Sequence, residues 1–161
     1  MTQDNTIDTV EVKRVYYNSG AICYEVPLVN GQRHGIAKRY YESGALERET
    51  PYVNGNIHGI EKTYYASGVL WHENPYVNGV MHGIVKWYYE SGVLEREVPY
   101  VEGDRHGIVK HYYESGALRR ETPYVNGRKH GIERGYDKDK TSVHCLSLYD
   151  KGREVLSLYN V

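Results

Sequence analysis

Five histidines recur every 24 residues, each just before a glycine, and are the first candidates for metal chemistry: His34, His58, His82, His106 and His130. If successive repeats stack in order, equivalent positions lie two strands apart, roughly 9–10 Å. Two histidines on one zinc ion need Zn–N distances of about 2.0–2.1 Å. The histidines therefore cannot share metal ions along their length. We predict no metal site and a structural role at a turn, with each imidazole bonding to backbone groups.

A second repeated set combines carboxylates with cations: Glu25, Glu49, Glu73, Glu97 and Glu121 with Lys38, Lys62, Lys86, Lys110 and Arg134. A catalytic acid–base pair occurs once, in a pocket whose neighbours shift its pKa. Five equivalent copies on a solvated ribbon instead favour cross-strand charge pairs, about 0.2–1 kcal/mol each. The sequence also has no Ser-His-Asp spacing, glycine-rich phosphate loop or cysteine cluster. We therefore predict that the protein is not an enzyme and has no cofactor.

The positions that differ between repeats are the remaining candidates for function, because the fold itself requires the constant ones. The stretch from Tyr64 to Trp87 contains both tryptophans of the protein and one of its two methionines. Tryptophan and methionine are enriched at protein interfaces, and tryptophan at their hot spots. The predicted partner-binding residues in this stretch are Val69, Trp71, His72, Met81, Val85 and Trp87.

The turn at Asn78–Val80 determines how these residues face one another. A three-residue loop would place Trp71 opposite Trp87, and a four-residue loop would shift the pairing by one place and leave the rings within diagonal reach. Val69 and Val85 would lie on the same face because side chains alternate along a strand. Three interpretations stay open: a surface for a different protein, a homodimer contact, or rings that only cover a thin sheet.

The fifth repeat is basic and suggests a second, weaker patch. Arg119 and Arg120 are its predicted partner-binding residues, with Arg128, Lys129 and Arg134 nearby. Either an acidic partner or water alone would suit such a surface. The whole chain is balanced, with 20 Lys and Arg against 21 Asp and Glu. This balance argues against a dedicated nucleic-acid binder, and the lack of any run of four basic residues argues against a membrane surface.

The elements that position these residues repeat with the same period. A Tyr-Tyr doublet opens each repeat, and a fixed period of this size is typical of repeat architectures. We predict a tail and capping strand at 1–15, in which residues 1–5 are disordered, and a C-terminal capping β-hairpin at 136–161. Between them lie five repeats at 16–135, with boundaries at 16–39, 40–63, 64–87, 88–111 and 112–135.

Each repeat contains two turn signals and two short strand-like runs. Tyr-x-Ser-Gly predicts a three-residue turn that ends in a glycine bulge, and Asn-Gly predicts a hairpin. A three-residue turn is also expected at Asp150–Gly152. The proline of each repeat cannot donate to a ladder, so we expect the strand to break or bulge just before it. Glycine and proline make helices costly. The predicted fold is all-β: a single-layer, twisted, antiparallel meander of β-hairpin repeats, curved into a trough.

The Tyr-x-Ser-Gly, Asn-Gly and His-Gly segments at this spacing resemble the MORN repeat. The match is closer to its bacterial variant, in which Tyr-Tyr-x-x-Gly-x-Leu precedes an Asn-Gly-x-x-His-Gly half. The resemblance covers residues 16–135 and extends loosely into the tail. Proteins built from this variant are often assigned to the YwqK family of antitoxins. The resemblance therefore implies a non-enzymatic protein-binding or immunity role.

The sequence predicts a binding protein that occludes a protein partner, in this family a toxin, with the concave face of its trough. The alternatives are a self-associating structural scaffold and a binder of small molecules or lipid headgroups. The chain shows no signal segment and no apolar stretch of 18 residues. A cytoplasmic location is therefore expected.

Overall fold

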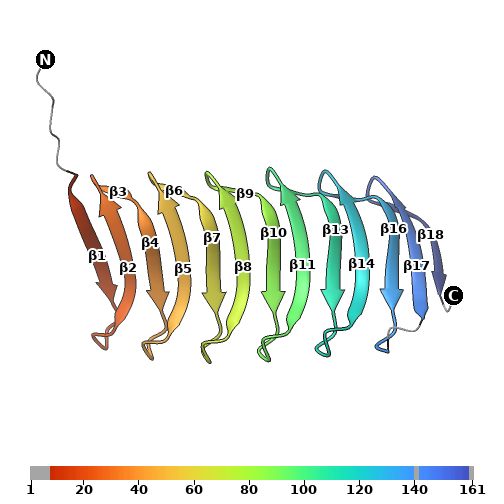
Figure 1. Cartoon of the computed structure of the whole chain (residues 1–161), viewed down its shortest axis with the longest axis horizontal. Coiled ribbons are helices and arrows are strands. Elements are labelled where there is room, and N and C mark those ends of the chain that lie inside the picture. Colours follow the sequence, from red (N-terminus) through yellow and green to blue (C-terminus); the bar gives the residue numbers. More distant parts are fainter. Residues whose placement is uncertain (1–7, 140–141, 160–161) are drawn as a thin grey trace, which may run out of the picture.

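A computed structural model describes residues 8–139 and 142–159 as one open, single-layer β-sheet (Figure 1). The predicted disorder of residues 1–5 lies outside the described residues. The described strands are thirteen of six to eight residues and five of two residues. They are β1 (Val10–Tyr16), β2 (Ile22–Val29), β3 (Gln32–Arg33), β4 (Gly35–Tyr40), β5 (Leu46–Val53), β6 (Asn56–Ile57), β7 (Gly59–Tyr64), β8 (Leu70–Val77), β9 (Val80–Met81), β10 (Gly83–Tyr88), β11 (Leu94–Val101), β12 (Asp104–Arg105), β13 (Gly107–Tyr112), β14 (Leu118–Val125), β15 (Arg128–Lys129), β16 (Gly131–Tyr136), β17 (Val143–Asp150) and β18 (Arg153–Tyr159).

Each strand of six to eight residues pairs antiparallel with the next such strand along the chain, so the sheet is a continuous meander. Each two-residue strand pairs with the long strand that precedes it. A long, a two-residue and a six-residue strand follow one another in each repeat, as in β8, β9 and β10. The strands β1 and β18 lie at opposite ends of the ribbon (Figure 1). The predicted all-β meander is confirmed. No helix in the part of the chain that the structure describes is long and apolar enough to cross a membrane.

The Ser-Gly turns have the predicted form. In the second repeat the amide of Gly44 donates to the carbonyl of Tyr41 at 2.9 Å, and the amide of Tyr41 donates to the carbonyl of Ala45 at 2.8 Å. Gly44 has a φ of 86°, the left-handed conformation that glycine adopts without steric cost. This arrangement is a three-residue turn that ends in a glycine bulge.

The Asn-Gly turns are one residue shorter than predicted. Val77 lies opposite Val80, so only Asn78 and Gly79 form the loop. Their φ angles are 49° and 82°, and two consecutive positive φ values define the two-residue turn that matches the twist of a hairpin. The turn between β17 and β18 is also two residues long rather than three, because Asp150 pairs with Arg153.

The prolines do not break their strands as predicted. Pro75 lies within β8, and its carbonyl accepts the amide of His82 at 3.1 Å. A residue's N–H and C=O point to the same side of a strand, so the missing proline donor faces the partner strand where that strand is interrupted. The interruption is at His82, which lies between β9 and β10 and is followed by Gly83, the first residue of β10. A Cβ on Gly83 would lie 3.1 Å from the Pro75 ring, closer than ordinary contact, and the φ of 114° at Gly83 also favours glycine.

Side chains alternate between two faces of the sheet. We call face A the side that carries Val85 and Trp87 of β10, and face B the side that carries Ile84 and Lys86. The midline of face A is a row of buried side chains, contributed by successive strands. The row consists of Val26, Ala37, Thr50, Glu61, Asn74, Val85, Val98, Val109, Thr122, Glu133 and Ser147. This row, covered by the longer side chains on either side of it, takes the place of a core between layers.

Two ladders of hydrogen bonds join successive repeats at the opposite edges of the ribbon. At the Ser-Gly edge, the hydroxyl of the second tyrosine in each doublet donates to a backbone carbonyl of the next repeat at 2.7–3.0 Å. At the Asn-Gly edge, the glycine amide donates to a carbonyl of the preceding repeat, as from Gly79 to Ile57 at 2.7 Å. The tyrosine ladder needs a hydroxyl that phenylalanine lacks, in a chain with 18 Tyr and no Phe.

A third ladder lies on face B. The hydroxyl of the first tyrosine in each doublet from the second repeat on donates to the glutamate of the preceding repeat, as from Tyr88 to Glu73 at 3.1 Å. The repeated lysines lie opposite these glutamates in the register, as Lys86 does with Glu73 and Glu97. The predicted cross-strand neighbours are therefore present. The hydrogen bonds of the glutamates, however, come from tyrosine, with one more from Arg14 to Glu25 at 2.7 Å.

The fourth Asn-Gly turn has Glu102 in place of asparagine, at a φ of 50°. A left-handed conformation costs most residues roughly 1–2 kcal/mol, and asparagine tolerates it best after glycine. We expect Glu102→Asn to raise the free energy of unfolding by about 1 kcal/mol and Tm by about 2–4 °C. Thermal denaturation measures this. The reverse change at an equivalent turn, Asn54→Glu, should lower Tm by a similar amount, and equal Tm values would contradict the account.

Burial and the glutamate hydrogen bonds raise the pKa of Tyr64 and Tyr112 to about 12, and burial and the charge of Glu73 do the same for Tyr88. Unfolded tyrosine ionises near 10, so the unfolded state loses these protons first. Stability from these groups is complete below pH 10 and is lost as the pH rises towards 12. Urea denaturation between pH 9 and 11.5 should show this loss. The triple variant with phenylalanine at these positions should show a smaller pH dependence.

Candidate functional site

The variable residues of the third repeat meet on face A, with a register different from the predicted one. Trp87 lies opposite His72, so the predicted pairing of Trp71 with Trp87 is wrong. Had the register of the two-residue turn continued, Trp87 would face Leu70. The interruption at His82-Gly83 moves the register by two residues. The rings of His72 and Trp87 lie 6.5 Å apart between centroids.

Trp71 joins this group through a β-bulge. Thr63 pairs with His72 and Tyr64 pairs with Leu70, which leaves Trp71 as the extra residue. A bulge redirects a side chain that strict alternation would send to the other face. The Trp71 ring lies 4.7 Å from the His72 ring and 5.9 Å from the Tyr65 ring. His72 thus lies between the two tryptophans, and Trp71 is 41% exposed.

His72 is a neutral member of this aromatic cluster. Burial lowers the pKa of His72, and the charge of Arg48 lowers it further against the opposing charge of Glu61. The ring nitrogen Nδ1 lies 3.2 Å from Nδ2 of Asn74, whose amide also donates to Glu61 at 3.3 Å. These contacts hold the ring in place. We call Trp71, His72 and Trp87 the aromatic cluster.

The other predicted residues of this repeat differ in exposure. Met81 pairs with Tyr76 and lies beside it on face A, half-buried. Val85 is 1% exposed, so it offers a partner no surface, contrary to the prediction. Val69 lies in the turn before β8, where its carbonyl accepts the amide of Tyr65 at 2.8 Å. It lies outside the ladder, so the predicted alternation that would relate it to Val85 does not apply.

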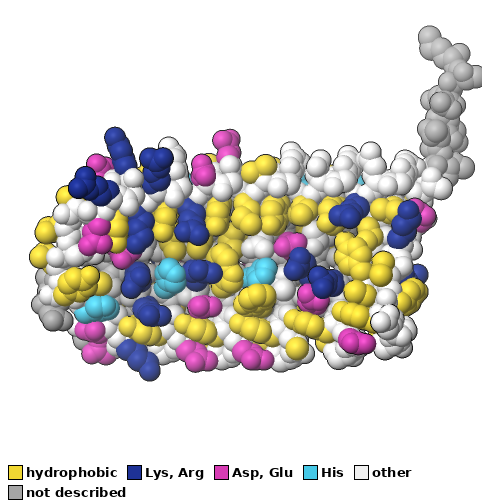
Figure 2. All heavy atoms as spheres, turned by 180° about the vertical axis from the view of Figure 1, so that it is seen from behind, with side chains coloured by type: hydrophobic (Ala, Val, Ile, Leu, Met, Phe, Trp, Pro, Cys, Tyr) yellow, Lys and Arg dark blue, Asp and Glu magenta, His cyan; other side chains and the backbone are white. Residues whose placement is uncertain are grey.

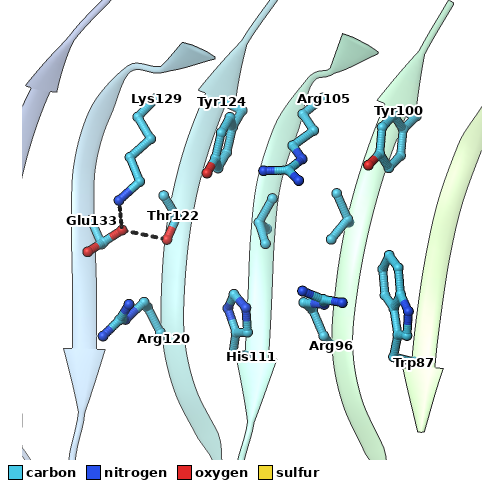
Figure 3. Close-up of a pocket in the computed structure, with 12 residues that line it drawn as sticks. Trp87, Arg96, Tyr100, Arg105, His111, Arg120, Thr122, Tyr124, Lys129 and Glu133 are labelled. Atoms are coloured by element: carbon cyan, nitrogen blue, oxygen red, sulfur yellow. Dashed lines mark hydrogen bonds and ion pairs between the residues drawn. The ribbon is translucent and has the colours of Figure 1, made fainter. Parts of the chain in front are cut away.

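Two hollows lie on face A, one towards each end of the ribbon from the aromatic cluster. The first, of about 550 Å³, lies over β1 to β7 and includes Arg39, Arg48 and Glu61 in its lining. The second, of about 290 Å³, lies over β10 to β16 and begins at Trp87 (Figure 3). Figure 2 shows one face of the sheet, on which Lys, Arg and His side chains lie along the middle among hydrophobic ones.

The second hollow joins the basic patch to the aromatic cluster, which the sequence had left as separate surfaces. Arg120 lines it together with Trp87, whereas the Arg119 guanidinium lies 5.7 Å from the Tyr113 ring. Three further residues of the fourth repeat line the hollow and were not predicted: Arg96, Arg105 and His111. They lie 24 residues after His72, Met81 and Trp87, at equivalent positions of the next repeat. The variable positions of the fourth repeat therefore carried the signal that identifies them.

The carboxylate that lines the second hollow, Glu133, is already paired with a cation. Glu133 accepts hydrogen bonds from Lys129 at 2.9 Å and from Thr122 at 2.7 Å (Figure 3). Burial raises the pKa of Glu133, but these two hydrogen bonds and the charges of Lys129 and Arg120 outweigh it and hold the pKa below its usual value. Glu133 is therefore ionised at neutral pH.

The repeated histidines lie at the Asn-Gly edge and have structural contacts. Their backbone amides donate to the proline carbonyls at 3.0–3.1 Å. Where the imidazole has a partner, that partner is a side chain of the next turn rather than the predicted backbone: Nδ1 of His58 lies 3.3 Å from Oδ1 of Asn78, and Nδ1 of His130 lies 3.4 Å from Oδ1 of Asp150. The described residues contain no group of three or more His, Cys, Asp or Glu side chains arranged to hold a metal ion.

The repeat itself has counterparts among known families. The model of the MORN repeat variant matches residues 33–54, 57–78, 81–102 and 105–126. These segments begin every 24 residues and together include more than half of the chain. A comparison with curated proteins found no match.

Proposed function

Because the chain belongs to the MORN repeat variant family, we propose that it is a protein-binding member whose partner docks on face A at the aromatic cluster. MORN repeats are non-catalytic modules that generally bind proteins or lipids. A protein partner is favoured here by the chemistry of the cluster, since tryptophan is the residue most enriched at hot spots of protein interfaces.

The observation that carries the proposal is the position of both tryptophans on the face that varies between repeats. Face B holds the constant tyrosine, glutamate, proline and lysine ladders. Trp71, in contrast, is 41% exposed although the fold does not require it: Glu47, Glu95 and Arg119 replace it in other repeats. An exposed tryptophan beside a second one, flanked by two hollows, has the features of a docking surface.

We extend the proposal to an antitoxin or immunity role in the cytoplasm, in which the ribbon blocks a protein toxin by covering it. The support for this part is the resemblance of the repeats to the bacterial variant found in antitoxins. The mechanism would be steric, and Trp71 and Trp87 would supply most of the binding energy. A partner that arrests growth when expressed without this protein would support the role, and a harmless partner would contradict it.

Replacing the tryptophans tests the proposed surface. Buried tryptophans at hot spots contribute at least about 2 kcal/mol each, which corresponds to roughly 30-fold in affinity. We expect Trp71→Ala and Trp87→Ala to weaken capture of the partner from its own host by about that factor each, and the double variant to abolish capture. Affinity chromatography followed by titration with the isolated partner measures this.

Ile84→Ala is the matched control, because Ile84 is 50% exposed on face B of β10, the strand that carries Trp87. It should leave capture unchanged. Undiminished capture by the double tryptophan variant would exclude the aromatic cluster as the site. Equal losses in the control would show that folding, rather than contact, had changed.

A second candidate function, self-association, is favoured by the C-terminal hairpin. On face B, Leu148, Leu156 and Leu158 are 40%, 54% and 48% exposed. Ile132 and Leu146 adjoin them in one apolar patch. β18 pairs only with β17 among the described residues, so its outer edge offers backbone groups beside the leucines. Such an edge is a template for pairing with a second copy.

Sedimentation distinguishes self-association from a monomeric binder. If the hairpin pairs with a second copy, the sedimentation coefficient rises with concentration. Leu156→Lys then makes the protein monomeric, because a charge on a desolvated apolar patch opposes pairing. Ile84→Lys, on the same face in the middle of the ribbon, should leave the association unchanged. A wild-type protein that stays monomeric at high concentration excludes this function.

A further inference from the structure

The second hollow of face A carries more positive charge than its carboxylate neutralises. Glu133 is paired with Lys129 at 2.9 Å. Among the ion pairs between described residues, none includes Arg96, Arg105 or Arg120. All three line the same hollow (Figure 3). Three guanidinium groups therefore surround a volume of about 290 Å³ without a carboxylate of their own.

The two arginines of this row also lack a carboxylate across the sheet. Arg96 lies opposite His111, and His111 lies opposite Arg120, so an imidazole separates the two guanidinium groups on adjacent strands. Face B differs, since Lys86 lies between Glu73 and Glu97. The positive charge of Arg96 and Arg120 is therefore available to an anionic ligand.

Two nitrogen atoms in this row are buried and unpaired. Nε of Arg96 and Nδ1 of His111 are inaccessible to solvent and have no hydrogen-bond partner, and the same is true of Nε of Arg48 in the first hollow. Buried polar groups in folded proteins are nearly always hydrogen-bonded, so both hollows contain an unpaired arginine nitrogen, and the choice between them rests on charge. The Arg96 guanidinium also lies 3.9 Å from the centre of the Trp87 ring. This stacking holds the guanidinium in one orientation before any ligand arrives.

We propose that this hollow is an oxyanion-binding site for the dianionic phosphate of a phosphate monoester, held between Arg96 and Arg120 with His111 behind it and Arg105 at the rim. Guanidinium groups bind phosphate through pairs of parallel hydrogen bonds. A dianion leaves the three arginines with one net positive charge, whereas a monocarboxylate leaves two. The inference does not require the protein partner proposed above, because one chain alone lines the hollow, although Trp87 belongs to both proposed sites.

The first hollow provides the internal comparison. Three arginines line it as well: Arg33, Arg39 and Arg48. There, however, Arg39 pairs with Glu47 at 2.9 Å, and Glu61 is part of the lining without a lysine partner. The two carboxylates reduce the net charge of that hollow to about one positive unit. A dianion should therefore select the second hollow.

Titration of the full chain with inorganic phosphate at constant ionic strength tests the site. Tryptophan fluorescence should saturate with one site, because Trp87 lines the hollow, and acetate should bind at least tenfold more weakly. Arg96→Gln and Arg120→Gln should each weaken phosphate binding at least tenfold. Arg134→Gln removes the same charge from face B of β16 and should leave the affinity unchanged. Circular dichroism of each variant confirms that it is folded.

The titration of His111 gives a second readout. Burial and the charges of Arg96, Arg120 and Arg119, against the opposing charge of Glu133, lower the pKa of His111 to about 4. A bound dianion offsets the arginine charges, so the pKa should rise towards its ordinary value near 6.5. NMR of the histidine ring protons with and without phosphate measures this in the wild-type protein. No variant is needed.

Two arms identify the source of the phosphate. If the ligand is soluble, the protein binds glycerol phosphate at least as tightly as inorganic phosphate and does not sediment with vesicles. If the ligand is a lipid headgroup, the protein sediments with phosphatidylcholine vesicles that contain phosphatidic acid, and added phosphate releases it. Either result supports the proposed chemistry. The proposal is overturned if folded wild-type protein shows no saturable phosphate binding, if acetate binds as tightly, or if Arg134→Gln weakens binding as much as Arg96→Gln.

Discussion

Residues 8–139 and 142–159 form one sheet without a second layer, and this is the constraint on which the rest of the structure depends. A single sheet cannot bury a face against another sheet or helix, so each repeat must be stabilised by the repeats beside it. The chain meets this need with the buried midline of face A and with hydrogen-bond ladders at both edges and on face B. Stability in such an array is a sum over neighbours, so the same contacts have to recur in every repeat.

The recurrence divides the two faces by role. Face B and the edges hold the tyrosine–glutamate hydrogen bonds and the close approach of Gly83 to Pro75. These positions cannot vary without breaking a ladder. One outer row of face A takes part in none of these ladders. It changes from Arg48 to His72, Arg96 and Arg120 along equivalent positions, so binding chemistry can vary there at little cost to the fold.

Two local departures from regular strand pairing determine which side chains of the site meet. The bulge at Trp71 brings adjacent aromatic side chains together, and the two-residue shift at His82-Gly83 sets His72 rather than Trp71 opposite Trp87. Because side chains alternate with a period of two, a register error of one residue reverses a face. The sequence therefore predicted the cluster by composition but mispaired its members.

The sequence by itself determined the repeat, the all-β meander, the glycine-bulge turns and the residues that depart from the template. These follow from local chemistry: periodicity, positive-φ glycines and the costs of helix. Only the tertiary structure decided the register, the burial of Val85 and the union of Trp87 with Arg96, His111 and Arg120 in one hollow. Such relations depend on how many residues each turn and interruption adds, and in a sheet this small number decides which side chains meet.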